Sequence, residues 1–169
     1  LLSFGLLSQV RVIARFSRLG RIEKRRNPMS TEIEVLAQIF GAINRNDMQA
    51  LTQDFDPQIV RIEPEGFGNR PTTGIYRGIT EVQEHIAQGR GTWAEGTCQP
   101  EKFLVNGDKV VVYVHVWVRL KISTDWIDGR IADGFVFRNG KIAQYLSFGA
   151  QADALTWAGI EEDGATGTG

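Results

Sequence analysis

The chain of 169 residues is short of the residue types that build many recognisable sites. It holds one cysteine, Cys98, which excludes an internal disulfide framework and a cysteine-rich metal site and fits a reducing compartment. We expect Cys98 to be a small apolar residue in a strand. The sequence has no paired-histidine zinc motif, no glycine-rich phosphate loop and no internal repeat. It therefore predicts neither a metal nor an organic cofactor.

Long apolar runs are also missing. No stretch of about 18 consecutive apolar residues occurs, so we expect no membrane-spanning helix. Apolar residues make up 42% of the chain and charged residues 23%, which is typical of a globular protein in water. The length suits one domain with a substantial core, and we expect a cytoplasmic protein.

The net charge of −1 conceals an uneven distribution. Residues 1–28 hold seven basic residues and one acid, whereas the remainder holds 12 basic and 19 acidic residues, a balance of −7. Binding to a phosphate backbone needs clustered Lys and Arg, so the acidic body argues against nucleic acid as a partner.

The basic and apolar leader, residues 1–28, has three interpretations. It resembles an organelle-targeting or membrane-surface segment, it could be a nucleic-acid-binding arm, or it is sequence upstream of a start at Met29, where "MSTEIE" reads like a natural N-terminus. We expect one domain over residues 29–160 and a disordered tail over 161–169.

Apolar periodicity predicts three helices in the N-terminal half. The capping-box sequence "TEIE" at residues 31–34 precedes apolar residues at helical spacing, which predicts a helix that ends near residue 46. Residues 46–55 predict a short second helix capped by Asn46 or Asp47. A second capping box, "TEVQ" at 80–83, predicts a third helix that ends near residue 88.

The remaining segments read as strands. A strand bounded by Pro57 and Pro64 is followed by residues 64–78, whose four glycines and two prolines predict a long loop. Four further strands are expected, joined by two turns with Asn-Gly: residues 92–105, 109–121, 125–138 and 141–150. Helices followed by an antiparallel meander make the fold class α+β.

Alternation in "VVVYVHVWVRLK", residues 110–121, separates two faces. The even positions from Val110 to Val118 are all valine and should meet the helices. The other face carries Tyr113, His115, Trp117 and Arg119, a composition favoured at protein interfaces, so we expect a homodimer. We expect His115 on this outer face rather than as a general base, and His85 as a solvated helix residue.

The stretch "IADGFVF" places a carboxylate in an apolar row, because Asp133 shares a strand face with Ile131, Phe135 and Phe137. A buried carboxylate must be paired or protonated, and burial raises its pKa. Asp133 is therefore the first catalytic candidate. Alternatively, it pairs with an arginine or a backbone amide, or a bulge at Gly134 turns it outward.

Glu63 is the second catalytic candidate, because it ends a strand beside the long loop. Alternation weakens it, since Val60 and Ile62 claim the apolar face, and an exposed strand-end acid is the alternative. Six further residues are expected to contact a substrate: Tyr145, Phe67, Trp93, Phe135, Ser147 and Phe40.

Three stretches, "FGAINRNDMQAL", "VRIEPEG…TTGIYRGITEVQEHI" and "DGFVFRNGKIAQYLSF", resemble the nuclear transport factor 2-like superfamily. Its ketosteroid isomerase-like and polyketide cyclase-like (SnoaL-like) branch is the most similar. The resemblance implies a cone-shaped, curved antiparallel sheet wrapped around the three helices. It also places Glu63, before Pro64, where ketosteroid isomerases have a general base, and Asp133 where they hold a protonated oxyanion-hole Asp.

The resemblance has departures. The oxyanion-hole tyrosine of the family falls near Ile39 and Phe40, which cannot donate, and Tyr145 is a substitute from another wall. Ser147 stands where epoxide hydrolases of this fold carry a carboxylate. We therefore expect acid–base chemistry next to the carbonyl of a small hydrophobic substrate, without cofactor. A non-catalytic binding or dimeric assembly module is the alternative.

Overall fold

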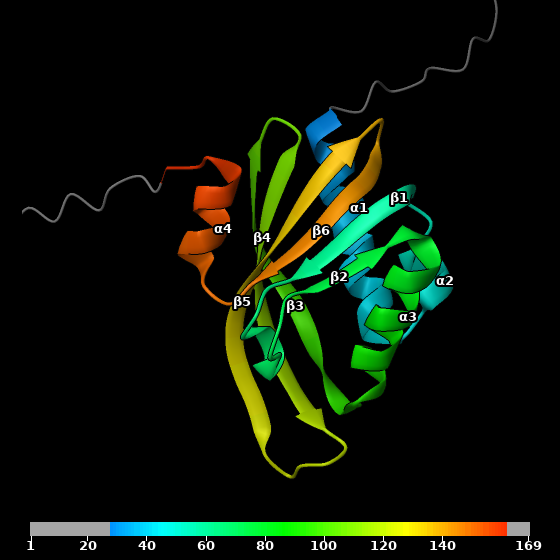
Figure 1. Ribbon diagram of the computed structural model, residues 1–169, viewed down its shortest axis with the longest axis vertical. Coiled ribbons are helices and arrows are strands. Elements are labelled where there is room, and N and C mark those ends of the chain that lie inside the picture. The colour runs from blue at the N-terminus through cyan, green and yellow to red at the C-terminus, as the bar shows by residue number, and fades with distance from the viewer. Residues whose placement is uncertain (1–27, 162–169) are drawn as a thin grey trace, which may run out of the picture.

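The computed structural model describes residues 28–161, so the predictions for the leader and the tail lie outside the described residues. Figure 1 shows the elements in chain order: α1 (Pro28–Arg45), α2 (Met48–Leu51), β1 (Phe55–Glu63), the short 3-10 turn η1 (Phe67–Asn69), β2 (Gly74–Arg77), α3 (Gly78–Gly91), β3 (Trp93–Asn106), β4 (Lys109–Leu120), β5 (Trp126–Arg138), β6 (Lys141–Phe148) and α4 (Gln151–Ala158).

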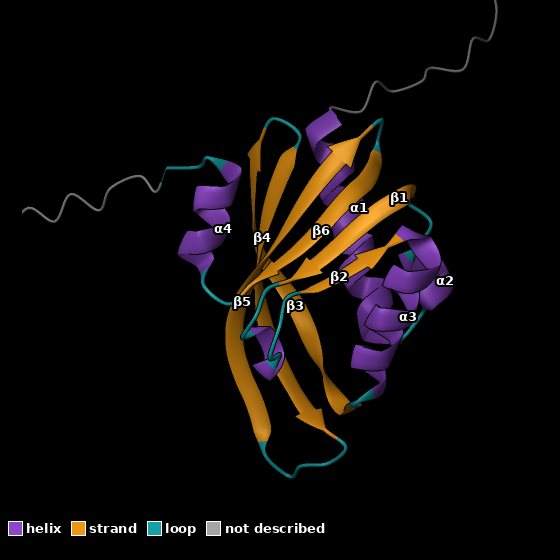
Figure 2. Ribbon diagram, viewed as in Figure 1, coloured by secondary structure: helices purple, strands orange, loops and turns teal. Residues whose placement is uncertain are grey.

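The six strands form one sheet in the order β2-β1-β6-β5-β4-β3. Neighbouring strands are antiparallel, except that β1 and β6 run parallel. The sheet is curved, with α1, α2 and α3 on one side and α4 on the other (Figure 2). The predicted α+β class, with a curved sheet and helices in the N-terminal half, is confirmed.

The predicted helices exist, but both capping boxes are wrong. The helix α1 begins at Pro28, upstream of "TEIE", and proline is well suited to a first helical turn. In α3, the N-cap is Arg77, whose backbone N–H donates to the side chain of Glu81, so "TEVQ" lies inside the helix. Asp47 caps α2 as predicted, by accepting from the backbone N–H of Ala50 at 3.0 Å.

Two elements differ from the sequence prediction. Residues 74–77 of the predicted loop form β2, which pairs with the end of β1 so that Gly74 lies opposite Glu63. The helix α4 was not predicted. It packs Ala154 and Ala158 against Val111 and Ala132 on the outer side of the sheet.

The main core lies between the inner face of the sheet and the helices α1 and α3. As predicted, the even-numbered valines of β4 face inward, and Val110, Val112 and Val114 are fully buried in this core. On the opposite face, the ring of Trp117 stacks on that of Trp126 at 4.1 Å. This outer face is uncovered where α4 ends, and both indoles are more than a third exposed.

Candidate active site

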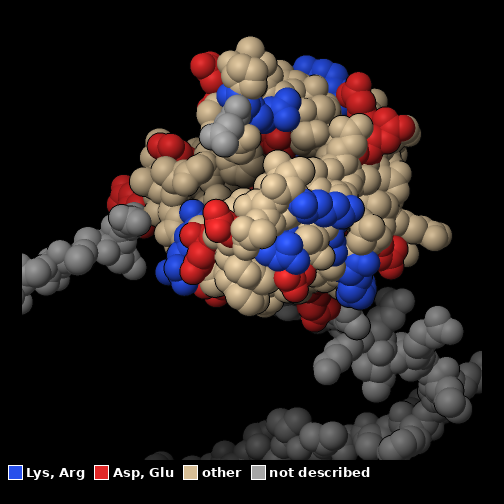
Figure 3. Space-filling view, turned by 90° about the horizontal axis from the view of Figure 1, so that it is seen from below, with Lys and Arg blue, Asp and Glu red and all other residues tan. Residues whose placement is uncertain are grey.

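A cavity of about 450 Å³ lies between the inner face of the sheet and the helices α1 and α3. Its walls are mainly apolar and include side chains from α1, α3 and five strands, among them Phe40, Ile86, Trp93, Val114 and Ile131. The view from below shows the surface hollowed on this side of the molecule (Figure 3). Polar side chains gather at one place on the cavity wall, where β1, β5 and β6 meet.

Asp133 lies on the inner face of β5 and is only 3% exposed. Its register partner on β6 is Ser147, whose hydroxyl donates to Oδ1 at 2.8 Å. The hydroxyl of Tyr145 donates to Oδ2 at 3.0 Å. Burial raises the pKa of Asp133, while the Arg61 guanidinium and these two hydrogen bonds oppose the rise. The Asp133 carboxyl group therefore binds a proton more tightly than a solvent-exposed Asp does.

Arg61 projects from β1 into the same cluster. The parallel pairing of β1 with β6 places it opposite Tyr145, and its guanidinium lies 3.9 Å from the centre of the Tyr145 ring. Its Nη2 donates to the Ser147 hydroxyl at 3.1 Å and to Oε1 of Glu63 at 2.6 Å. Burial alone would lower the pKa of Arg61, but Tyr145, Asp133 and Glu63 raise it, so this buried side chain is a permanent cation.

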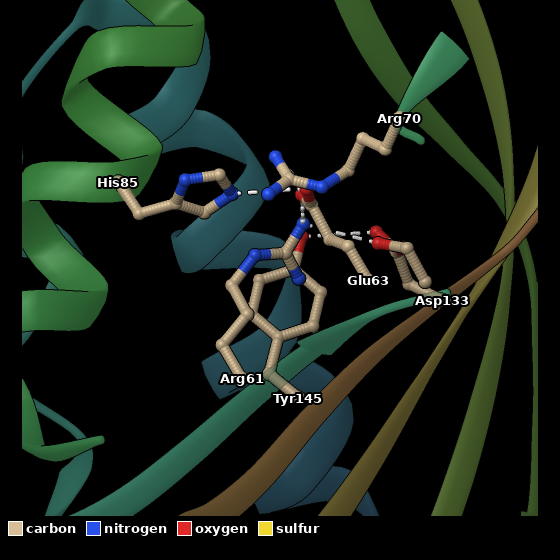
Figure 4. Close-up of polar contacts among 7 residues, drawn as sticks. Arg61, Glu63, Arg70, His85, Asp133 and Tyr145 are labelled. Carbon is tan, nitrogen blue, oxygen red and sulfur yellow. Dashed lines mark hydrogen bonds and ion pairs between the residues drawn. The ribbon is translucent and has the colours of Figure 1, made fainter. Parts of the chain in front are cut away.

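Glu63 is also buried, and cationic or donor groups surround it (Figure 4). Besides Arg61, its Oε2 lies 3.0 Å from Nε2 of His85 and 3.5 Å from Nη1 of Arg70. Burial alone would raise the pKa of Glu63. The hydrogen bond with His85 and the charge of Arg61 outweigh this effect and hold the pKa at about 2. Glu63 is therefore ionised at neutral pH and is a weak proton acceptor.

The face of β1 was predicted wrongly. Ile59, Arg61 and Glu63 alternate on the buried side, whereas Val60 and Ile62 are half-buried on the other. The charged residues can point inward because partners from β6, α3 and the loop after β1 compensate their burial.

The structure brings together most of the predicted site. Glu63, Asp133, Tyr145, Ser147, Phe40, Phe67 and Trp93 all line the cavity. Phe135 does not line it: its ring packs against Phe40 and Tyr145, with centroids 6.3 and 4.5 Å away, and is fully buried behind the wall. The bulk of these two rings separates Phe135 from the cavity.

Sequence reasoning missed the basic side of the site. His85 was expected in solvent, but its side chain is 15% exposed, and its ring stacks on Tyr76 at 3.7 Å while it contacts Glu63. Arg61 and Arg70 were not candidates either. The available signal was the alternation of Arg61 and Glu63 with Ile59 on one strand face. His115, by contrast, lies on the outer face as predicted and contacts Asp128 at 2.6 Å.

The remaining thiol and the metal-ligating side chain types also bear on the chemistry of the cavity. Cys98 lies in β3 and lines the cavity, but burial raises the pKa of its thiol to about 12, so it is not a thiolate at neutral pH. Within residues 28–161, no group of three or more His, Cys, Asp or Glu side chains is placed to hold a metal ion.

Among the helices that the structure describes, none combines the length and apolarity that crossing a membrane requires.

Comparison with known proteins gives a family match and many structural neighbours. Residues 36–145 match the sequence profile of the SnoaL-like domain. No curated protein sequence matches significantly. TerC, crystallised with polyporic acid, is 20% identical, with 76% of this chain and 97% of that one covered and a TM-score of 0.62.

Two further solved structures are similar. An NTF2-like protein of unknown function from Burkholderia pseudomallei K96243 is 19% identical over 77% of this chain and 98% of that one, with a TM-score of 0.64. A putative polyketide cyclase from Sinorhizobium meliloti is 23% identical over 68% of this chain and 93% of that one, with a TM-score of 0.54. At these identities, the structural likeness establishes the fold alone.

Proposed function

Because the chain belongs to the SnoaL-like domain family, we propose that it is an enzyme acting on a small, largely apolar carbonyl compound bound in the cavity. The proposed reaction moves a proton at the carbon next to the carbonyl, as isomerisation and ring closure require. The single observation that carries this proposal is the buried carboxyl of Asp133, held by Tyr145 and Ser147 in the wall of an apolar cavity.

Asp133 is the proposed proton acceptor and donor. Each of its oxygens accepts one hydrogen bond from a hydroxyl and keeps further acceptor capacity for a substrate proton. Taking up that proton neutralises a carboxylate whose ionised form burial disfavours, which makes the transfer easier. Returning the proton to another atom of the bound substrate completes the reaction.

Glu63 is proposed as a positioning residue rather than the base expected from the sequence. A carboxylate with a pKa of about 2 binds a proton too weakly to abstract one from carbon effectively. Its contacts with Arg61 and Arg70 instead fix the two guanidinium groups of the site, and its contact with His85 fixes the imidazole ring.

The names of the structural neighbours support a substrate of this kind. TerC was crystallised with polyporic acid, and the Sinorhizobium meliloti protein is a putative polyketide cyclase. Both names point to carbonyl-bearing ring compounds, which would suit a cavity of about 450 Å³ with aromatic and valine walls.

The experiment is proton exchange at carbon. The full chain is incubated in D₂O with 2-tetralone, and the loss of α-proton signals is followed by NMR. We expect exchange above the buffer rate, reduced about 100-fold or more in Asp133→Asn. The control variant is Asp125→Asn, which changes an exposed turn carboxylate outside the cavity. Exchange that is equally fast in Asp133→Asn would overturn the assignment.

A non-catalytic binding module of the same fold is the second candidate. It is favoured by the contacts of Glu63, the expected base, with Arg61, Arg70 and His85, which occupy both of its carboxylate oxygens. In that case 2-tetralone would bind without any enzyme-dependent exchange. For either candidate, we propose a homodimer formed through the outer face of β4 and β5, around Trp117 and Trp126.

A further inference from the structure

We propose that the polar part of the cavity is an anion-binding subsite, in which Arg61 and Arg70 bind an ionised oxygen of the substrate. The substrate class is then a planar apolar molecule that carries a carboxylate or an ionised enol. This inference rests on the proposed function, since it names the substrate of the same site.

The first observation is a set of buried donors without acceptors. Among the residues that the structure describes, Nε and Nη1 of Arg61 and Nε of Arg70 are shielded from solvent and have no hydrogen-bond partner. Arg61 is 6% exposed, and both arginines line the cavity. A buried guanidinium N–H without an acceptor is costly, and protein interiors rarely leave one so. An anionic ligand oxygen would supply the missing acceptor.

The second observation is the charge of the lining. The lining includes three guanidinium groups, those of Arg61, Arg70 and Arg90, and two carboxyl groups, those of Glu63 and Asp133. Even with both acids ionised, the cations are in excess by one. The body of the chain outside the leader has the opposite balance, −7. The excess positive charge is therefore a local property of this cavity, and it favours an anionic ligand.

The third observation is the rigidity of Arg61. Its Nη2 is fixed by Glu63 and Ser147, and the Tyr145 ring lies against the guanidinium at 3.9 Å. These contacts hold the guanidinium plane without using the N–H groups of Nη1. A preorganised guanidinium loses little entropy on binding and forms strong charge-assisted hydrogen bonds to carboxylate-like oxygens. Arg70 approaches the same cluster from the loop after η1, where its Nη1 lies 3.5 Å from Glu63.

The walls define the rest of the ligand. Apolar side chains such as Phe67, Trp93 and Val114 make up most of the lining around the polar cluster. They would bury the rings of an aromatic acid while its ionised oxygen lies on the arginines. A neutral analogue of the same shape would keep the apolar contacts and lose the charged ones.

The test compares isosteric ligands by isothermal titration calorimetry on the full chain. 2-Naphthoate is compared with 2-naphthamide, which has the same rings and no charge. We expect 2-naphthoate to bind about tenfold or more tightly than the amide. 2-Hydroxy-1,4-naphthoquinone, an ionised enol at neutral pH, forms the second arm: tighter binding of this compound than of 2-naphthoate identifies an enolate rather than a carboxylate as the preferred anion.

Variants locate the subsite. Arg70→Gln, at a side chain 31% exposed and therefore tolerant of change, should weaken anion binding about tenfold and leave 2-naphthamide unaffected. Arg61→Lys keeps the charge but loses the planar group, and should also weaken the anions selectively. Arg138→Gln, at an exposed residue of β5, is the control and should change neither ligand.

Three results would each overturn the proposal. The amide and the anions could bind with equal affinity, both arginine variants could leave the anion affinity unchanged, or no anion could bind at millimolar concentration. Its failure is distinguishable from that of the proposed function. Selective anion binding without exchange dependent on Asp133 retains the subsite and rejects the enzyme, whereas exchange without anion selectivity does the reverse.

Discussion

Arg61 and Glu63 lie two positions apart on the buried face of β1, with Nη2 of one 2.6 Å from Oε1 of the other. Neighbours on a single strand face thus form an ion pair whose side chains are 7% and 11% exposed. Removing one partner of such a pair leaves the other charge buried and poorly compensated. The pair therefore couples the folding of the domain to the ionisation of its site.

Glu63→Gln should destabilise the protein in a pH-dependent way. The folded-state pKa of Glu63 is lowered from 4.5 to about 2, so its ionisation stabilises the fold above about pH 4.5, and this contribution is lost as the pH falls toward 2. We expect a loss of about 3 kcal/mol in the free energy of unfolding at pH 7. Urea unfolding between pH 3 and pH 7 should show the loss shrinking at the acidic end.

Glu65→Gln is the matched control for this prediction, because Glu65 is exposed on the loop that follows β1. It should leave the pH dependence of unfolding as in the wild type. If the free energies of unfolding of Glu63→Gln and wild type differed by the same amount over the whole pH range, the ion pair would contribute nothing to the pH dependence of stability.

Asp133→Asn should have the opposite pH dependence. Burial raises the folded-state pKa of Asp133 above 3.8, so the fold binds the proton more tightly than the unfolded chain does. Its contribution to stability is complete below pH 3.8 and declines as the pH rises toward the folded-state pKa. The variant removes this decline and should therefore be more stable than wild type at pH 7.

Thermal unfolding at pH 7 and at pH 3.5 checks the Asp133→Asn prediction, with Asp125→Asn as the exposed control. The gain should disappear at the lower pH. A variant that is less stable than wild type at pH 7 would mean that the contacts of the Asp133 carboxylate with Arg61 and the two hydroxyl donors outweigh the cost of its burial.

The sequence predicted the parts of the site whose pattern is local. Simple alternation along β4 identifies the face on which its valines lie. Asp133 is conspicuous on β5 because its neighbours on the same face of that strand are apolar. The inward orientation of Arg61 and Glu63 could not be predicted in the same way. Each charge is tolerated only because of partners distant in sequence, such as Ser147 for Arg61 and His85 for Glu63.

The same limit explains the missed elements. Residues 74–77 contain too few apolar side chains to identify a strand, and β2 forms because β1 offers it an edge. The helix α4 forms where it can pack on the outer face of the sheet. Gly134 leaves room for this packing, because a Cβ at that position would lie 2.7 Å from the ring of Trp157.

Gly96→Ala should be strongly destabilising. Gly96 has a φ of +122°, and an added Cβ would lie 2.2 Å from the carbonyl oxygen of Trp117 and 2.5 Å from the Cα of Val118, which are backbone atoms and cannot rotate away. We expect a loss of about 3 kcal/mol or more, measured by urea unfolding. Gly129→Ala is the control, because nothing lies within 4 Å of its added Cβ. Comparable losses in the two variants would contradict this steric explanation.

Trp117→Glu should separate the proposed homodimer. Trp117 is 46% exposed and stacks on Trp126, which is 39% exposed, so the outer face presents two large apolar rings to a partner. In a twofold-symmetric interface a residue near the axis lies close to its own copy, so each new carboxylate would meet another. Wild type should sediment at twice the chain mass of 18.8 kDa, and Trp117→Glu at the single mass with an unchanged circular dichroism spectrum.

Ile122→Glu is the control for the dimer prediction. Ile122 is 93% exposed in the turn between β4 and β5, so this variant adds the same charge beyond the ends of the two strands that form the proposed contact. It should remain a dimer. A wild-type protein that sediments at the single-chain mass at high micromolar concentration would rule the dimer out. A dimer that persists in Trp117→Glu would move the contact to another face.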